Sequence, residues 1–251
     1  MAPHASLARV STPPRPDRPV LLRMSALAQV RAGRKTRRLL QLLVGLVGYG
    51  AAVMTLVLSG LGAASWNVLT EGTAHVWGIS FGWATNLISV LVLLTWIPLR
   101  ELPGLGTFLN VAVVGFAADA TAVVLPEPHG LPARIAYLLI GVVALAFFDA
   151  LYLGAQFGSG PRDGIMTGLV RVTRLPLPAV RTAIEVTVAG TGWLLGGTVG
   201  VGTVLIALCM GPLVGFFLPR TTVRLPAPPP YERDERDERD ERGERGERDE
   251  P

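Results

Sequence analysis

Long runs of apolar residues, separated by short polar stretches, dominate this chain. A helix rises about 1.5 Å per residue, so about twenty apolar residues cross the ~30 Å hydrocarbon core of a bilayer. The runs predict an all-α, polytopic membrane protein and exclude a soluble globular enzyme, a DNA-binding domain and a disulfide scaffold. Six transmembrane helices are expected, at Leu39–Gly60, Ile79–Leu99, Leu105–Pro126, Ile135–Gln156, Leu177–Leu195 and Val199–Pro219.

Charged residues change this picture only at the two ends of the chain. Residues 1–38 hold nine Lys/Arg and one Asp, and residues 231–251 hold eleven Asp/Glu and six Arg. Residues 39–219 keep only six Arg and seven acids. We therefore expect a basic disordered segment over 1–38, a transmembrane domain over 39–219 and a disordered Arg/Glu/Asp-rich tail over 220–251. A cleaved signal peptide is the alternative for the first run, although 22 residues is long for one.

Arginine placement predicts the orientation, because cytoplasmic loops collect Lys and Arg. If both termini lie in the cytoplasm, the inner loops hold every arginine near a helix end except Arg134. The same placement accounts for the pI of about 9.8, so the basic residues do not indicate nucleic-acid binding. Cys209 is the single cysteine, and the three histidines lie far apart, so no metal site and no cofactor is expected.

The chain contains an internal repeat. Shifting it by 96 residues aligns 38–115 with 134–211 without a gap, with 18 identities in 78 positions. Each copy holds three expected helices, and an odd number makes the second copy enter the membrane from the opposite side. Two inverted three-helix repeats are therefore predicted, an architecture that places substrate sites of secondary transporters near the midplane. The identities include a Gly-x-Gly-Thr motif and a later glycine, for which we expect a role in close helix packing: Gly104, Gly106, Thr107 and Gly115, with Gly200, Gly202, Thr203 and Gly211.

Two glycine-rich loops are superimposed by the repeat, Gly62–Gly72 and Gly158–Gly168. A short interfacial or re-entrant helix fits both loops. Asn67 and Asp163 occupy matched positions, and free backbone amides at such a turn favour anions. The loops are either paired gates or binding turns, or helix caps in which Asn67 and Asp163 start a surface helix.

Several of these motifs resemble the YczE/YyaS/YitT family of bacterial integral membrane proteins. The resemblance rests on Gly158-x-Gly-Pro-Arg-Asp-Gly164, Gly78-Ile-Ser-Phe-Gly82, Arg181-x-x-x-Glu185 and the glycine-rich run Gly192–Thr203, followed by Gly211-Pro212. It covers Leu39–Pro219 and implies a polytopic protein of the bacterial inner membrane. The chain departs from the family pattern in two places. It has Ala64-Ser65 where the first repeat of the family more usually has Ser-Pro, and it has arginine-rich tails.

Ionisable residues inside membrane spans are candidates for function, because burying them costs several kcal/mol. Asp149 is expected to be the deepest carboxylate and suits proton coupling. Arg181 and Glu185 lie four residues apart on one helix face, which favours an intrahelical ion pair. With the loop residues, the candidate substrate-binding set is Asn67, Asp119, Asp149, Gly158, Gly160, Pro161, Arg162, Asp163, Arg181 and Glu185.

No catalytic set or nucleotide fingerprint accompanies these residues, so we do not expect an enzyme. The expected function is a proton-linked small-molecule transporter or permease-like protein in contact with the lipid bilayer. The alternative is a non-transporting accessory or scaffold protein that contacts a membrane or cytoplasmic partner. Its contact surfaces would be the tails and the loop that carries Arg162, Arg171 and Arg174.

Overall fold

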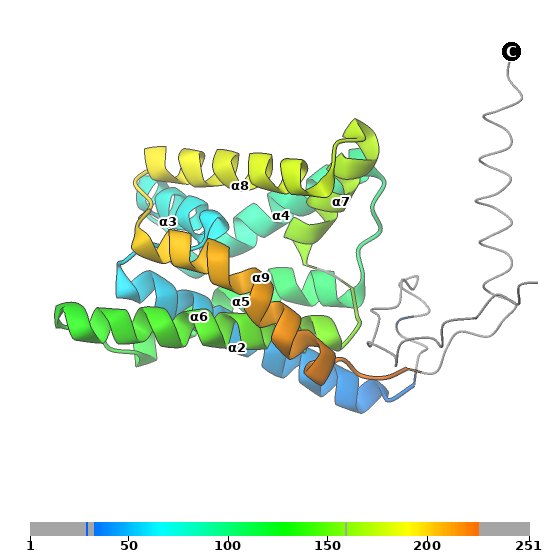
Figure 1. Ribbon diagram of the computed structural model, residues 1–251, viewed down its shortest axis with the longest axis horizontal. Coiled ribbons are helices and arrows are strands. Elements are labelled where there is room, and N and C mark those ends of the chain that lie inside the picture. The colour runs from blue at the N-terminus through cyan, green and yellow to red at the C-terminus, as the bar shows by residue number, and fades with distance from the viewer. Residues whose placement is uncertain (1–28, 30–32, 159, 226–251) are drawn as a thin grey trace, which may run out of the picture.

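The computed structural model describes residues 29, 33–158 and 160–225. These residues form eight helices and no strand. The helices are α2 (Lys35–Ser59), α3 (Ser65–Trp77), α4 (Phe81–Leu99), α5 (Leu105–Val124), α6 (Gly130–Gly154), α7 (Pro161–Thr173), α8 (Leu177–Leu194) and α9 (Val201–Thr221) (Figure 1).

Five of these helices, α2, α4, α5, α6 and α9, are long and apolar enough to cross a membrane. Many of their large apolar side chains point away from the protein, as in Ile97, which is 74% exposed. Such a surface suits lipid rather than water. The helix α8 lies where the remaining span was expected, but it is less apolar because it carries Arg181 and Glu185. A total of six spans therefore stays a prediction.

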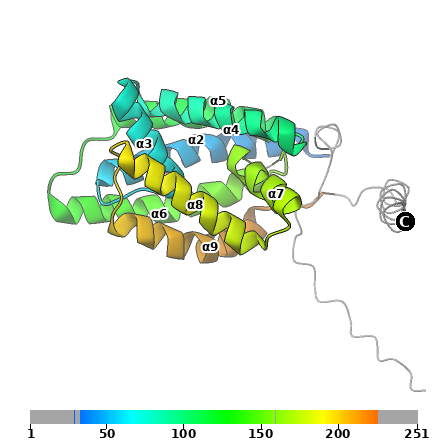
Figure 2. The ribbon, with the colours of Figure 1, turned by 90° about the horizontal axis from the view of Figure 1, so that it is seen from above.

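The helices form two layers (Figures 1 and 2). In one layer α2 and α6 lie side by side, with α5 packed on α2 and α9 packed on α6. In the other layer α3 packs on α8 and α4 packs on α7. Contact between α4 and α5 joins the layers.

The helix boundaries recur along the chain. The helices α3, α4 and α5 begin at residues 65, 81 and 105, and α7, α8 and α9 begin 96 residues later, at 161, 177 and 201. Each half therefore contains three long helices and one short helix. The short helices, α3 and α7, occupy the two glycine-rich loops, where the sequence predicted short helices.

Two arginines join the central helices in the same way. At the start of α2, Arg38 Nε donates to the carbonyl of Ala155, just beyond the end of α6, over 2.9 Å. At the start of α6, Arg134 Nε donates to the carbonyl of Ser59, at the end of α2, over 2.6 Å. Each arginine thus caps the end of the other helix, so α2 and α6 run antiparallel. Arg134 is the one arginine near a helix end that the predicted orientation does not place in an inner loop. Its hydrogen bond to the end of α2 gives it a structural role.

The Gly-x-Gly-Thr motifs bring the starts of α5 and α9 against the opposite half. The amide of Gly106 donates to the carbonyl of Phe157, and the amide of Gly202 donates to the carbonyl of Leu61, each over 2.8 Å. The side chains of Thr107 and Thr203 accept from the amides of Gly104 and Gly200. Gly158 packs against Gly104, as Gly62 does against Gly200. Both Gly62 and Gly158 have positive φ, which favours glycine.

The last glycine pair of the repeat behaves differently in the two halves. A Cβ atom on Gly115 would lie 2.3 Å from the carbonyl oxygen of Gly82, so α4 and α5 touch there. A Cβ atom on Gly211 would meet nothing within 4 Å. Correspondingly, α8 makes no extensive contact with α9.

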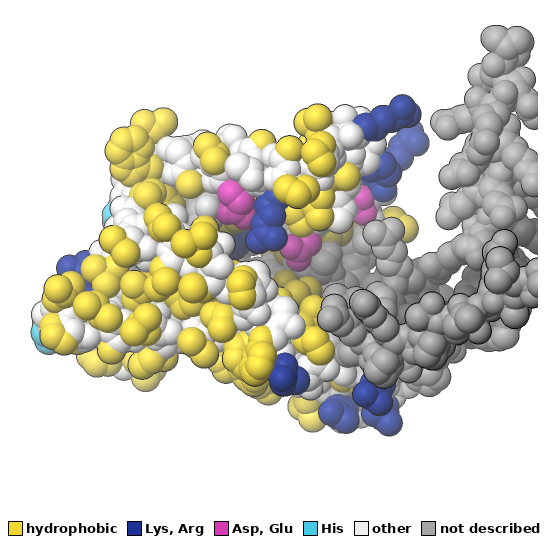
Figure 3. All heavy atoms as spheres, viewed as in Figure 1, with side chains coloured by type: hydrophobic (Ala, Val, Ile, Leu, Met, Phe, Trp, Pro, Cys, Tyr) yellow, Lys and Arg dark blue, Asp and Glu magenta, His cyan; other side chains and the backbone are white. Residues whose placement is uncertain are grey.

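Both described ends of the chain lie at the same end of the helices (Figure 1). Most visible Lys and Arg side chains also gather there (Figure 3). Residues 220–223 continue the folded part, because α9 ends at Thr221 and the amide of Val223 donates to Gly154. The segments expected to be disordered were 1–38 and 220–251; Lys35–Arg38 instead belong to α2, and residues 1–28, 30–32 and 226–251 lie outside the described residues.

Candidate functional site

A cavity of about 460 Å³ lies between the two layers of helices. Each of the eight helices supplies part of its wall, so the cavity depends on the whole fold. Figure 3 shows a hollow in this region, where acidic and basic side chains gather on an otherwise largely apolar face.

Five acidic or basic side chains line the cavity: Asp149, Arg162, Asp163, Arg181 and Glu185. They come from α6, α7 and α8, which the fold brings together around one space. Charges in a spanning segment are tolerated when they face water or one another in a cavity. This cavity therefore suits a polar or charged ligand.

The two short helices direct their N-terminal ends into this cavity. Ser65 and Trp66 begin α3, Pro161 and Arg162 begin α7, and all four line the cavity. The Arg162 guanidinium carbon lies 5.2 Å from the centre of the Trp66 ring, within the range of a cation–π contact. Since Trp66 and Arg162 are 96 residues apart, equivalent positions of the two halves meet here.

Polar groups converge near Gly160, where α7 begins. A Cβ atom at Gly160 would lie 3.2 Å from the Tyr152 hydroxyl, 3.6 Å from Asn110 Nδ2 and 3.7 Å from Asp163 Oδ2. The Asp163 side chain is partly buried and lines the cavity. This burial raises the pKa of the Asp163 carboxyl above its ordinary value, against the nearby charges of Arg162 and Arg181.

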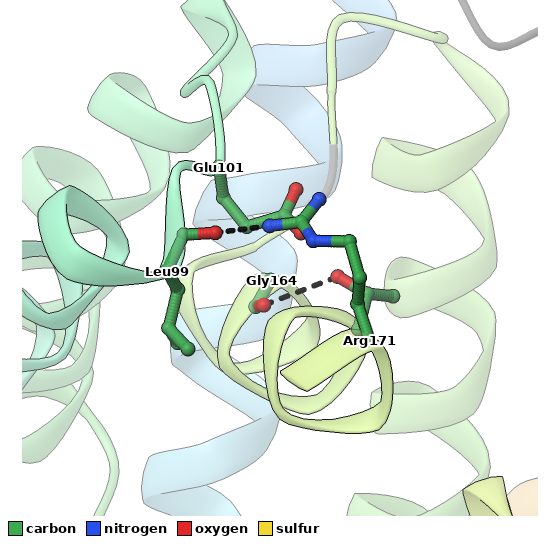
Figure 4. Close-up of polar contacts among 5 residues, drawn as sticks. Leu99, Glu101, Gly164 and Arg171 are labelled. Carbon is green, nitrogen blue, oxygen red and sulfur yellow. Dashed lines mark hydrogen bonds and ion pairs between the residues drawn. The ribbon is translucent and has the colours of Figure 1, made fainter. Parts of the chain in front are cut away.

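Contacts with α4 hold α7 in place. Trp96 donates its indole N–H to the carbonyl of Pro161 over 2.9 Å, and a Cβ atom on Gly164 would collide with the Trp96 ring. At the other end of α7, Arg171 pairs with Glu101 at 3.1 Å and donates to the carbonyl of Leu99 (Figure 4). These contacts fix the entry of α7 into the cavity.

Seven of the ten candidate binding residues line the cavity. They are Asp149, Gly160, Pro161, Arg162, Asp163, Arg181 and Glu185. Within α6, Asp149 lies five residues before Gly154 and nineteen after Gly130.

Three candidates lie elsewhere. Asp119 accepts from the Ser80 hydroxyl over 2.5 Å and from the Gly82 amide over 2.7 Å, so it caps the start of α4. Gly158 packs against Gly104 in the loop before α7. Asn67 is buried in α3, and its amide nitrogen makes no hydrogen bond. Their positions give Asp119 and Gly158 structural roles.

The expected ion pair between Arg181 and Glu185 is not formed. Among the described residues, the single ion pair joins Arg171 to Glu101. Arg181 and Glu185 both line the cavity instead, where each charge remains available to a ligand.

Sequence reasoning missed the aromatic and hydroxyl part of the wall, which includes Tyr49, Trp66, Thr85, Ser89 and Tyr152. The repeat holds a signal for two of these residues, because Thr85 and Ser89 lie 96 residues before Arg181 and Glu185. In the part of the chain that the structure covers, no group of three or more His, Cys, Asp or Glu side chains could hold a metal ion.

Comparison with known proteins gives a consistent class. A model described as a family of unknown function, DUF6198, matches residues 36–219. An uncharacterized protein of Haemophilus influenzae is 41% identical over 79% of this chain and 89% of its own length. The uncharacterized membrane protein YczE of Bacillus subtilis is 28% identical over 64% of this chain and 75% of its own. Uncharacterized protein YyaS of the same organism is 24% identical over 70% and 90%. No solved structure matches the chain.

Proposed function

This chain belongs to the YczE-like family of membrane proteins described as DUF6198, and we propose that it carries a small molecule across the bacterial inner membrane through the cavity between its two halves. The observation behind this proposal is the gathering of five acidic or basic side chains around one cavity inside an apolar helical domain. A purely structural bundle has no need of such a space, because close packing stabilises the interior.

The proposed architecture is an inverted repeat with six spans. The 96-residue recurrence of helix starts and the antiparallel capping by Arg38 and Arg134 support it. An axis in the membrane plane would place the cavity near the midplane, where carriers of this architecture bind substrate. Both termini would lie in the cytoplasm, because basic side chains gather at the end where the described chain begins and ends.

Proton coupling is the proposed source of energy, and the cavity serves for binding rather than catalysis. Asp149 and Asp163 both face the cavity and are near enough to influence each other electrostatically. A carboxylate that binds a proton in one conformation of the carrier and releases it in the other couples proton movement to substrate movement. Arg162 and Arg181 offer positive charge to an anionic part of the substrate.

The alternative of an accessory protein is less favoured by these contacts. Its contact surface would use Arg162, Arg171 and Arg174 at the cytoplasmic side. Arg162 faces the cavity, and Arg171 is engaged with Glu101 and Leu99. Arg174 remains exposed for a partner.

The test uses the full chain in proteoliposomes loaded with a pH-sensitive dye. Candidate solutes are added singly, and a proton-linked substrate changes the internal pH in wild type. We expect Asp149→Asn to abolish this response, because an amide keeps the size and polarity of a protonated carboxyl but cannot release a proton. Asp119→Asn is the matched control, since Asp119 lies in a span but outside the cavity. A full response in Asp149→Asn would refute proton coupling through Asp149, and the absence of any response in wild type would favour the accessory role.

A further inference from the structure

The cavity is open to the side between α8 and α9. In the first half of the molecule, α4 closes against α5 at Gly82 and Gly115, and Thr85 is buried there. In the second half, the glycine equivalent to Gly115 faces open space, and Arg181, equivalent to Thr85, is exposed. The hollow with charged side chains in Figure 3 lies on this face.

This opening places charge where lipid would meet the protein. Arg181 and Glu185 lie one helical turn apart, they do not pair, and both belong to the cavity wall. Hydrocarbon cannot cover an exposed guanidinium without a cost of several kcal/mol. Either water or a polar group of a membrane molecule must therefore reach this position.

We propose that the cavity binds the headgroup of a zwitterionic membrane amphiphile, which enters sideways between α8 and α9 while its acyl chains remain in the bilayer. An anionic group such as phosphate fits Arg181 and the exposed amides at the start of α7. A cationic group such as an ammonium fits Glu185 and Asp149. Large apolar side chains flank the opening, as in Val186 (66% exposed) and Leu208 (70% exposed), and suit the chains.

The positions of Arg181 and Glu185 along α8 support the binding of a lipid headgroup. Arg181 lies four residues and Glu185 eight residues after Leu177, where α8 begins. At about 1.5 Å per residue, these positions lie ~6 and ~12 Å from that end of the helix. A headgroup from the adjacent leaflet has only a short distance to move. This inference rests on the proposed function, since it names the substrate class of the same cavity.

Binding of three probes to the purified full chain in detergent tests the proposal by native mass spectrometry. The probes are short-chain phosphatidylethanolamine, short-chain phosphatidylglycerol and free phosphoethanolamine. We expect phosphatidylethanolamine to bind about tenfold more tightly than either of the others, because only it has both charges and the chains. Arg181→Gln and Glu185→Gln should each weaken it about tenfold.

Variants of the opening separate entry from the side from entry through water. Gly211→Leu adds a side chain next to the cavity-lining Met210, at a position where a Cβ atom meets nothing within 4 Å, and we expect it to narrow the opening and weaken phosphatidylethanolamine binding at least about tenfold. Thr182→Leu, on the exposed cavity-lining side of α8, repeats the block. Gly190→Leu is the matched control, because a side chain there also meets nothing within 4 Å, and neither Gly190 nor its two chain neighbours line the cavity.

Three results would overturn the inference. If phosphoethanolamine binds as tightly as phosphatidylethanolamine and Gly211→Leu does not weaken it, the ligand comes from water. Equal binding of phosphatidylglycerol would mean a site for anions alone. Binding unchanged in Arg181→Gln and Gly211→Leu would mean lipid on the outer surface only. Transport is measured separately, so lipid binding without any Asp149-dependent flux would refute the carrier role and leave this inference standing.

Discussion

Alanine at the two equivalent glycines, Gly115 and Gly211, should change stability by very different amounts. In Gly115→Ala the new Cβ atom would lie 2.1 Å from Asn86 Oδ1 and 2.3 Å from the Gly82 carbonyl oxygen. The Asn86 side chain can turn away, but the Gly82 carbonyl moves only if α4 moves. Overpacking of this kind costs about 1–3 kcal/mol. Gly211→Ala meets nothing within 4 Å beyond its chain neighbours, and the gain of about 0.5–1 kcal/mol from removing a helix glycine is opposed by Pro212, which disfavours a Cβ on the preceding helical residue, so little change is expected.

Thermal unfolding of the two variants in one detergent measures this difference. We expect a lower midpoint than wild type for Gly115→Ala and a midpoint close to that of wild type for Gly211→Ala. Gly82→Ala serves as a second probe of the same contact, since its Cβ atom would lie 2.2 Å from the Gly115 carbonyl oxygen. Equal shifts for Gly115→Ala and Gly211→Ala would refute the reasoning, because α8 would then close on α9 as α4 closes on α5.

Other predictions concern orientation, charge and anchoring. In a Cys209→Ser background, Val76→Cys should react with an impermeant thiol reagent on intact cells, and Val172→Cys only after lysis. Both positions are exposed and lie 96 residues apart. Labelling from the opposite sides would contradict the orientation. Because burial raises the pKa of Asp163, the folded state holds its proton to higher pH than the unfolded state, so stability should fall as pH rises from the ordinary carboxyl pKa of about 4 through the raised value. Asp163→Asn should lack this component in unfolding midpoints measured from pH 4 to 8, and an unchanged profile would contradict it. Arg171→Ala should cost no more than about 1 kcal/mol in the same unfolding assay, because the Arg171 side chain is 55% exposed, and a larger loss would show that this contact anchors α7 more strongly.

The sequence by itself determined the class of the protein and most limits of its helices, although α2 begins at Lys35 where Leu39 was expected and α6 at Gly130 where Ile135 was expected. Apolar runs long enough for a bilayer, ended by glycine, proline or charge, are local properties that need no tertiary contact. The 96-residue repeat also predicted that the short helices α3 and α7 would occur in pairs. Asp149, Arg181 and Glu185 were found because charge inside an apolar span is costly, and Gly160, Pro161, Arg162 and Asp163 were found from the repeated glycine-rich loop.

Only the tertiary structure decided which of these residues meet. Asp119 and Asp149 are both carboxylates in spanning helices, yet one caps α4 and the other faces the cavity. Helix periodicity gives the face of a residue on its own helix, but the neighbour of that face depends on how the helices pack. The same holds for Arg181 and Glu185. Their spacing predicted an ion pair, but in the structure both line the cavity and they do not pair.

The two copies of the repeat show the physical reason most directly. Gly115 and Gly211 occupy equivalent positions in similar sequences, and local sequence cannot distinguish them. Packing closes α4 on α5 around Gly115 and leaves α9 open at Gly211. Contacts between distant segments are properties of the whole arrangement, and a single arrangement can treat two related segments differently.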